Sequence, residues 1–193
     1  MESERTLSVR LRTPLTDEAI RALKVGDRVL LSGVVYSARD AAHKRLVEAI
    51  RAGKDLPFPL AGAVIYYVGP APAPPGEVIG PAGPTTSGRM DSFTPILLEY
   101  GLKGMIGKGK RDAAVRAALT KYTAIYLVAV GGAAALISTR IKQVRPVAYA
   151  DLGTEAISEL TVEDFPLVVA NDIYGADLYE QGKQAYRKAQ DGK

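Results

Sequence analysis

Short apolar runs rich in β-branched residues alternate with helix-forming segments along most of this chain. Runs of this kind, bounded by turn residues, predict buried strands. They lie at 28–37, 61–70 and 123–130. Segments with helical spacing or capping signals separate them, at 16–26, 38–52, 94–100 and 112–122. This alternation predicts an α/β or α+β fold in which strands and helices form separate layers.

The connections narrow the choice of architecture. Residues 70–75 are rich in Pro and Ala, which excludes a central strand or a helix there and predicts an exposed, hairpin-like connection. A short strand is expected next, at 77–79. Pro146 restricts the strand at 143–153 to a sheet edge. Because the strands are short, we predict a layered domain with a mixed sheet rather than a clean doubly wound sheet.

The chain length of 193 residues fits one domain, spanning 1–193. Residues 162–180 have the form of a strand, a turn at 172–175 and a trailing segment. The polar sequence from Gln181 onward predicts a frayed tail over 181–193. No internal repeat is visible.

Charge and hydropathy argue against two classes of partner. The net charge is +4 and its basic residues are scattered, so the sequence does not indicate a nucleic-acid-binding patch. No window reaches the roughly 20 apolar residues that a membrane helix needs. The N-terminus is charged and lacks an apolar signal-peptide core, so a cytoplasmic location is expected.

The chain contains no cysteine and a single histidine, His43. The missing thiols exclude disulfides, thiol catalysis and any iron–sulfur or zinc site built on thiolates of this chain. One histidine excludes a multi-histidine metal site within one copy, and no cluster of acidic residues suggests a carboxylate site for Mg²⁺. No metal site is therefore expected here, and metal chemistry would need a metal held by another chain.

Three polar segments carry candidate functional residues, and the first is 37–46. It follows a predicted strand at the point where a helix begins, which is where ligands commonly bind in open α/β sheets. A helix N-terminus favours anions, and Arg39 adds a fork of donors suited to a carboxylate. Asp40 lies three residues before His43 and could orient its ring. In the alternative interpretation, Asp40 caps the helix and His43 packs against the next turn.

The second segment, 83–91, is a loop that reads GPTTSGRMD. Its consecutive hydroxyls, Thr85 and Thr86 among them, offer donors and acceptors, and its glycines let a ligand approach the backbone. Arg89 supplies a second guanidinium. The alternative is an ordinary loop that ends in a helix cap at Asp91.

The third segment, IGKG at 106–109, places Lys108 between two glycines at a predicted strand end. A P-loop is excluded, because its pattern would need glycine at Leu102 and a hydroxyl residue at Gly109. The alternative is a solvated turn lysine. Together, Arg39, Arg89 and Lys108 could bind a small polyanion such as a dicarboxylate. Hydrolase chemistry through Ser37 or Ser87 with His43 is a weaker option, since no nucleophile-elbow pattern is present.

These segments, with the later strings GGAAALI, DLGTEAI and VEDFPLVV, resemble the β subunit or C-terminal domain of class I (iron–sulfur) fumarases and the related L-tartrate dehydratases. The resemblance covers about residues 6–180. It implies a swivelling β/β/α domain and a partner α subunit, or N-terminal domain, that holds a [4Fe–4S] cluster. It also implies homodimerisation within a hetero-oligomer.

The resemblance assigns roles to the candidate residues. Arg39, Arg89 and Lys108 match substrate-binding positions, and Thr85 matches the proposed catalytic base. Supporting positions in the same strings are Asp40, His43, Thr86 and Asp91. The implied reaction is the reversible hydration of fumarate to malate, and the string DLGTEAI favours fumarate over tartrate. Tartrate dehydration, or a non-catalytic module that binds a dicarboxylate or a regulatory partner, is the alternative.

Overall fold

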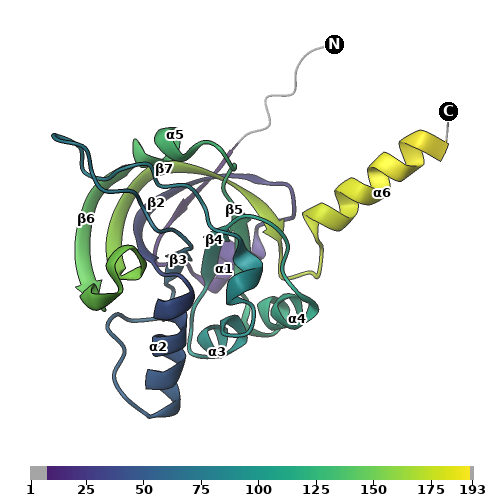
Figure 1. The fold of residues 1–193 in the computed structure, drawn as a ribbon. Helices are drawn as coiled ribbons and strands as arrows, with labels where there is room; N and C mark the ends of the chain where they lie inside the picture. The colour runs from purple at the N-terminus through teal and green to yellow at the C-terminus, as the bar shows by residue number, and fades with distance from the viewer. Residues whose placement is uncertain (1–7, 192–193) are drawn as a thin grey trace.

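The computed structural model describes residues 8–191, which are built around one mixed sheet of seven strands (Figure 1). The strands are β1 (Val9–Arg12), β2 (Arg28–Ser37), β3 (Val64–Tyr66), β4 (Gly104–Gly107), β5 (Ile125–Val128), β6 (Ile141–Ala148) and β7 (Ile157–Asn171). Their order is β1-β2-β3-β4-β5-β7-β6, in which β1 to β5 are parallel neighbours and β7 is antiparallel to β5 and β6. The predicted α/β class with a mixed sheet is confirmed.

The sheet closes on itself. β2 pairs with β7 along its whole length, from Arg28 opposite Val168 to Ser37 opposite Ser158. Because β7 also pairs with β5, the strands β2, β3, β4, β5 and β7 form a continuous ring. The ring gives two facing strand layers whose hydrogen-bonding edges satisfy each other.

Helices α2, α3 and α4 form a third layer on the outside of part of this ring (Figure 1). The helical elements are α1 (Asp17–Arg21), α2 (Asp40–Arg51), η1 (Ser87–Met90), α3 (Thr94–Glu99), α4 (Ala113–Tyr122), α5 (Ala134–Ser138), η2 (Ala150–Glu155) and α6 (Leu178–Asp191). Strand alternation divides the core in two. In β3, Val64 and Tyr66 belong to the cluster inside the ring, whereas Ile65 packs in the cluster that contains residues of α2, α3 and α4.

α2 follows β2 directly, as the sequence predicts. Its apolar positions Ala42, Leu46 and Ile50 recur at helical spacing and are buried against the outer face of the sheet. Arg39 is the N-cap residue, with extended backbone and no side-chain capping bond, so the start of this helix needs another partner for its free N–H groups.

Two strands expected in the middle of the chain differ in the structure: one is absent and the other is shorter. The expected strand at 77–79 is wrong, because this stretch forms a bend after the Pro-rich connection: Glu77 N donates to Pro74 O at 3.0 Å, and Ile79 packs into the core. The hairpin-like form of that connection is confirmed, since Ala71 N donates to Pro81 O. The expected strand at 61–70 is only three residues long. β6 pairs with β7 alone, as expected of an edge strand.

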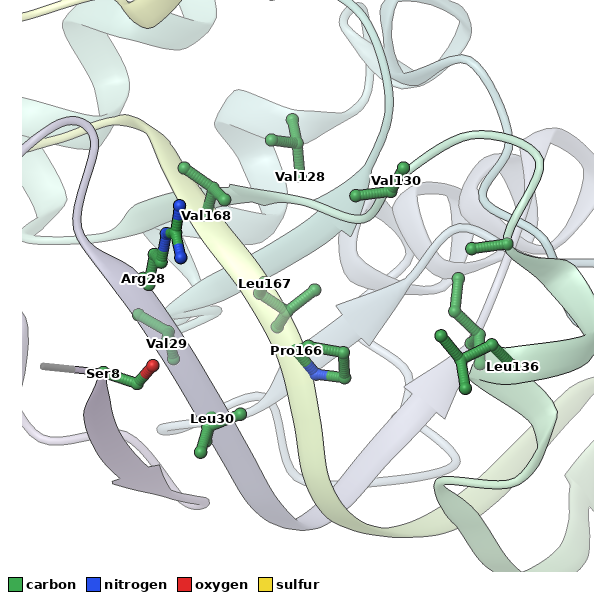
Figure 2. Close-up of a pocket in the computed structure, with 12 residues that line it drawn as sticks. Ser8, Arg28, Val29, Leu30, Val128, Val130, Leu136, Pro166, Leu167 and Val168 are labelled. Carbon is green, nitrogen blue, oxygen red and sulfur yellow. The ribbon is translucent and has the colours of Figure 1, made fainter. Parts of the chain in front are cut away.

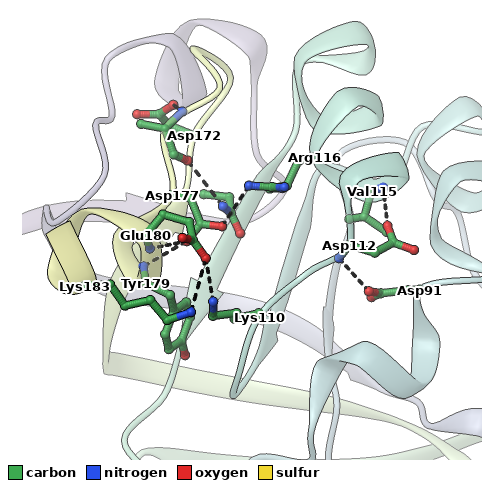
Figure 3. A network of polar contacts seen from close by, with 12 residues as sticks. Asp91, Lys110, Asp112, Val115, Arg116, Asp172, Asp177, Tyr179, Glu180 and Lys183 are labelled. Carbon is green, nitrogen blue, oxygen red and sulfur yellow. Dashed lines mark hydrogen bonds and ion pairs between the residues drawn. The ribbon is translucent and has the colours of Figure 1, made fainter.

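In the part of the chain that the structure describes, α6 continues through the tail that was predicted to fray from Gln181, as far as Asp191. The helix begins where Asp177 Oδ1 accepts hydrogen bonds from Tyr179 N and Glu180 N (Figure 3). Glu180 pairs with Lys110 at 2.5 Å, which ties the first turn to the body. Beyond it α6 projects away from the domain (Figure 1). Within residues 8–191, every helix is too short or too polar to cross a membrane.

Candidate functional site

The carboxyl ends of β2, β3 and β4 lie at one edge of the sheet, because these strands are parallel neighbours. Arg39 follows β2, and Lys108 follows β4. The loop at 83–89 is drawn to the same edge by backbone hydrogen bonds: Thr85 N donates to Tyr67 O at 2.7 Å, and Lys108 N donates to Thr85 O at 3.1 Å. The structure thus brings the three predicted segments together at this edge.

Ser87 anchors the loop against β4. Its side chain is fully buried, its backbone N–H donates to Lys108 O at 2.9 Å, and its hydroxyl lies 2.7 Å from the hydroxyl of Tyr126. A methyl group on Gly107 would lie 2.0 Å from Ser87 Oγ, so glycine is needed for the loop to lie flat on the strand. Ser87 is therefore a packing residue.

Ser37 is also buried, and its hydroxyl accepts a hydrogen bond from Ser158 N across the sheet. Neither Ser37 nor Ser87 is hydrogen-bonded to His43. The hydrolase alternative therefore lacks its serine–histidine pair.

Arg89 and Asp40 form an ion pair between the loop and the first turn of α2. Arg89 Nε donates to Asp40 Oδ1 at 2.9 Å, and Nη2 lies 2.8 Å from Oδ2. This parallel, two-contact geometry fixes the plane of the guanidinium. The side chain of Arg89 is half exposed, so the side of its guanidinium away from Asp40 can still meet a ligand.

Arg39 lies against the end of β3. A methyl group on Gly69 would meet Arg39 Nη1 at 2.3 Å, so the missing side chain at this position makes room for the guanidinium. Arg39 Nη2 lies 3.1 Å from Glu155 Oε1, and about four fifths of each side chain is buried. This acidic partner comes from the η2 segment before β7 and lies in the string DLGTEAI, but the sequence analysis did not pair it with Arg39.

His43 is fully buried under this edge and contacts Arg39 rather than Asp40. Its Nδ1 lies 2.8 Å from Arg39 O, which also accepts from His43 N at 2.8 Å. The expected pairing of Asp40 with the ring is wrong, because Arg89 takes both carboxylate oxygens of Asp40. Burial lowers the pKa of His43 to about 4, so the ring is neutral at pH 7. The neutral ring can donate a hydrogen bond from Nδ1 to Arg39 O, which holds the backbone of Arg39 in place.

At this edge, the side chains of Lys108 and Thr85 have no hydrogen-bond or ion-pair partner among the described residues. Lys108 is exposed, and within residues 8–191 its ammonium makes no hydrogen bond or ion pair. Thr85 is half-buried, and its hydroxyl is likewise free of hydrogen bonds to described residues, although its backbone is held on both sides. Thr86 is exposed and pairs with Lys108 in a single parallel bridge.

Asp91 does not face this edge but belongs to a buried network beside it. Its Oδ1 accepts from Arg111 Nε at 2.7 Å, and its Oδ2 accepts from Asp112 N at the start of α4 (Figure 3). Arg111 also donates to Tyr67 and Thr94, and its side chain is completely buried. Sequence reasoning missed Arg111, because no signal separates it from the exposed lysines before it in GKGKRD.

The charges of the edge nearly balance. Three cations, Arg39, Arg89 and Lys108, face the two carboxylates of Glu155 and Asp40, which leaves one positive charge in excess. A ligand with two carboxylates can therefore meet a cation with each of them without building up a large local charge.

A hollow elsewhere on the surface does not offer this chemistry. An apolar groove of about 410 Å³ lies between β2, β7 and α5, and its lining includes the exposed side chains of Val130 and Leu136 (Figure 2). Its one charged lining residue is Arg28. None of the predicted site residues reaches it.

The fold and the edge define a class of protein: a mixed-sheet domain that presents arginine, lysine and hydroxyl groups at the carboxyl ends of parallel strands. The model of the protein family described as "Fumarase C-terminus" matches residues 1–182. The chain belongs to this family, and the family predicted from the sequence motifs is confirmed.

The relatives have similar identities to this chain, but the chain covers very different shares of their lengths. The chain is 43% identical to the anaerobic class I fumarate hydratase of Escherichia coli (strain K12) over 81% of its own length, but only 29% of that protein. It is 37% identical to fumarate hydratase 2 of Leishmania major, covering 32% of that protein. It is 38% identical to the putative L(+)-tartrate dehydratase subunit beta of Methanocaldococcus jannaschii and covers 93% of it. The chain thus spans about three tenths of each of these two fumarate hydratases and nearly the whole of the β subunit.

Proposed function

We propose that this chain is the β-type half of a class I fumarate hydratase, which interconverts fumarate and malate together with a companion polypeptide in the cytoplasm. The observation that carries the proposal is the meeting of Arg39, Arg89, Lys108 and Thr85 at one edge of the sheet. Membership of the fumarase C-terminus family supports the reaction class.

The chain cannot hold the cluster that such a reaction implies. It has no cysteine, and within residues 8–191 no group of three or more histidine, aspartate or glutamate side chains could bind a metal ion. We place the [4Fe–4S] cluster on the companion, where it would supply a Lewis acid for the substrate hydroxyl. The steps assigned to this chain are binding, orientation and proton movement.

The cations of the edge bind and orient the dicarboxylate. Lys108 has no partner among the described residues and offers a whole ammonium group to one carboxylate. Arg39 and Arg89 are each held by one acidic side chain, so they are fixed before substrate arrives. Fixed donors stabilise the negative charge that builds on a carboxylate as the neighbouring C–H proton leaves, without the cost of reorganisation.

Thr85 is the residue we assign to that proton. Its hydroxyl makes no hydrogen bond within residues 8–191, and backbone bonds to Tyr67 and Lys108 fix its position on the sheet edge. A neutral alcohol is a poor base, so Thr85 can accept the substrate proton only after giving up its own proton to solvent, and a cation near the hydroxyl would favour that alkoxide. We assign this effect to Lys108, whose backbone N–H bonds to Thr85 O.

The arrangement of subunits is inferred from the coverage of relatives. A relative called subunit beta matches this chain over nearly its whole length, which supports a separate companion polypeptide. We infer that this chain also forms a homodimer within the larger hetero-oligomer.

The same relative makes tartrate the second candidate substrate, because it is described as a putative tartrate dehydratase. We favour fumarate and malate. Identities to relatives called fumarate hydratase range from 37% to 43%, against 38% for the tartrate dehydratase subunit.

A steady-state assay tests this function. The companion is identified by co-purification, the pair is assembled without oxygen, and turnover is measured with malate, fumarate and L-tartrate. We expect a kcat/KM for malate well above that for tartrate, and no turnover by this chain alone. Faster turnover of tartrate would favour the second candidate, and turnover by the chain alone would contradict the division of roles.

A further inference from the structure

Glu155 occupies a position at the site that no earlier assignment explains. Its Oε1 lies 3.1 Å from Arg39 Nη2, and its Oε2 accepts a hydrogen bond from Ala41 N at 3.0 Å. One carboxylate thus joins the arginine to a free N–H in the first turn of α2, where the helix has no side-chain cap of its own. Helix N-termini favour a negative group at this point.

The ion pair between Arg39 and Glu155 is largely buried, which makes it costly to break. The side chains of Arg39 and Glu155 are 21% and 23% exposed, so breaking the pair would leave a largely buried charge without a partner. Arg39 Nη1 occupies the space in which a side chain at Gly69 would begin, 2.3 Å from the position of its Cβ. The backbone carbonyl of Arg39 is held twice by His43. Arg39 is therefore fixed at both its backbone and its head group.

Glu155 uses only a small part of what Arg39 can donate. A guanidinium carries five N–H groups, and Glu155 contacts one nitrogen, Nη2. Within residues 8–191, Arg39 Nε is buried and has no hydrogen-bond partner. The side chain of Arg39 is 21% exposed, so the part that Glu155 does not cover can meet a second carboxylate and Glu155 need not leave when a substrate binds. This distinguishes a residue that orients Arg39 from one that competes with the substrate for it.

We propose that Glu155 is a positioning residue, which holds the guanidinium of Arg39 in the orientation that binds a carboxylate of the substrate. The proposal rests on the function proposed above, because it requires Arg39 to contact the dicarboxylate. Glu155 acts through Arg39 and touches no reacting atom. Loss of Glu155 should therefore weaken substrate binding, because a misplaced arginine binds both the substrate and the transition state poorly.

The same segment provides a matched control. Asp151, four residues before Glu155 in η2, also pairs with α2: its Oδ1 accepts from Arg45 Nη1 at 2.8 Å. Asp151 is 64% exposed, and its partner Arg45 lies in α2, six residues after Arg39. Asp151→Asn therefore loosens η2 from α2 without touching Arg39, as a purely structural role for Glu155 would do.

The test compares E155Q with D151N in the chain assembled with its companion, with malate as the substrate. We expect E155Q to raise KM for malate about 10- to 100-fold with a smaller change in kcat, and D151N to leave both constants within about twofold. An unchanged KM in E155Q would overturn the proposal. So would a lowered KM, which would show that Glu155 competes with the substrate. If E155Q does not fold or assemble, E155D, whose shorter side chain cannot reach both Arg39 and Ala41, is judged by the same KM criterion.

A double-mutant cycle separates this proposal from the function on which it rests. If Glu155 acts through Arg39, then R39A and R39A/E155Q should share one raised KM for malate, since the second change has nothing left to misplace. Multiplying effects in the double variant would overturn the positioning role alone. An unchanged KM in R39A would overturn both the positioning role and the assignment of Arg39 to the substrate.

Discussion

Replacing Thr85 with valine should lower kcat for malate dehydration about 10²- to 10⁴-fold, the usual contribution of a positioned proton acceptor. Valine keeps the branched shape of threonine and removes only the hydroxyl. The backbone bonds that hold Thr85 to Tyr67 and Lys108 do not involve this group, so the loop should keep its place. KM should change little, because the cations that hold the carboxylates remain.

Thr85→Ser is the matched control for this change. Serine retains the hydroxyl and should keep kcat within about tenfold of the unchanged enzyme. Steady-state kinetics of the assembled pair, with the melting temperature of each variant, provides the measurement. A kcat for Thr85→Val equal to that of the unchanged enzyme would remove Thr85 from the proton-transfer step and leave only its backbone role.

The second large effect concerns stability. Replacing Arg111 with methionine should lower the free energy of unfolding by about 3–5 kcal/mol, the range seen when one partner of a buried ion pair is lost. Asp91 would remain buried and charged with only the bond from Asp112 N, and Thr94 Oγ1 and the Tyr67 hydroxyl would each lose a donor. Denaturant unfolding of the chain measures the change.

Arg145→Met is the control for Arg111→Met. Arg145 also pairs with an acidic residue, Glu159, but its side chain is 68% exposed. Exposed ion pairs contribute about 0–1 kcal/mol, so we expect a change within that range. Equal losses in the two variants would show that burial of the Arg111 network does not dominate its contribution.

The parts of the fold that follow from local sequence were predictable. β2 and α2 have clear periods of apolar residues, and Thr16 and Asp112 both cap helices with their side chains as their positions suggest. The closed ring of strands was not predictable, because it depends on β2 and β7, which are more than a hundred residues apart. No local pattern specifies such a pairing.

The candidate site shows the same division. Arg39, Arg89 and Lys108 could be singled out because each follows a strand or lies among glycines. Their acidic partners could not be assigned reliably. Asp40 was expected to contact His43, three residues away on the same helix, but it pairs instead with Arg89 across 49 positions. Glu155 lies 114 positions from Ala41. Such contacts are set by the topology of the sheet, which the sequence pattern does not encode locally.

The central claim is that the cations at this edge bind the carboxylates of the substrate, and Lys108 tests it most directly. Its ammonium is exposed and unpaired within the described residues, so Lys108→Met should leave the melting temperature unchanged. In the assembled pair, we predict that kcat/KM for malate falls about 10- to 100-fold, as expected for the loss of a hydrogen bond between charged groups. A kcat/KM for Lys108→Met equal to that of the unchanged enzyme would contradict the claim.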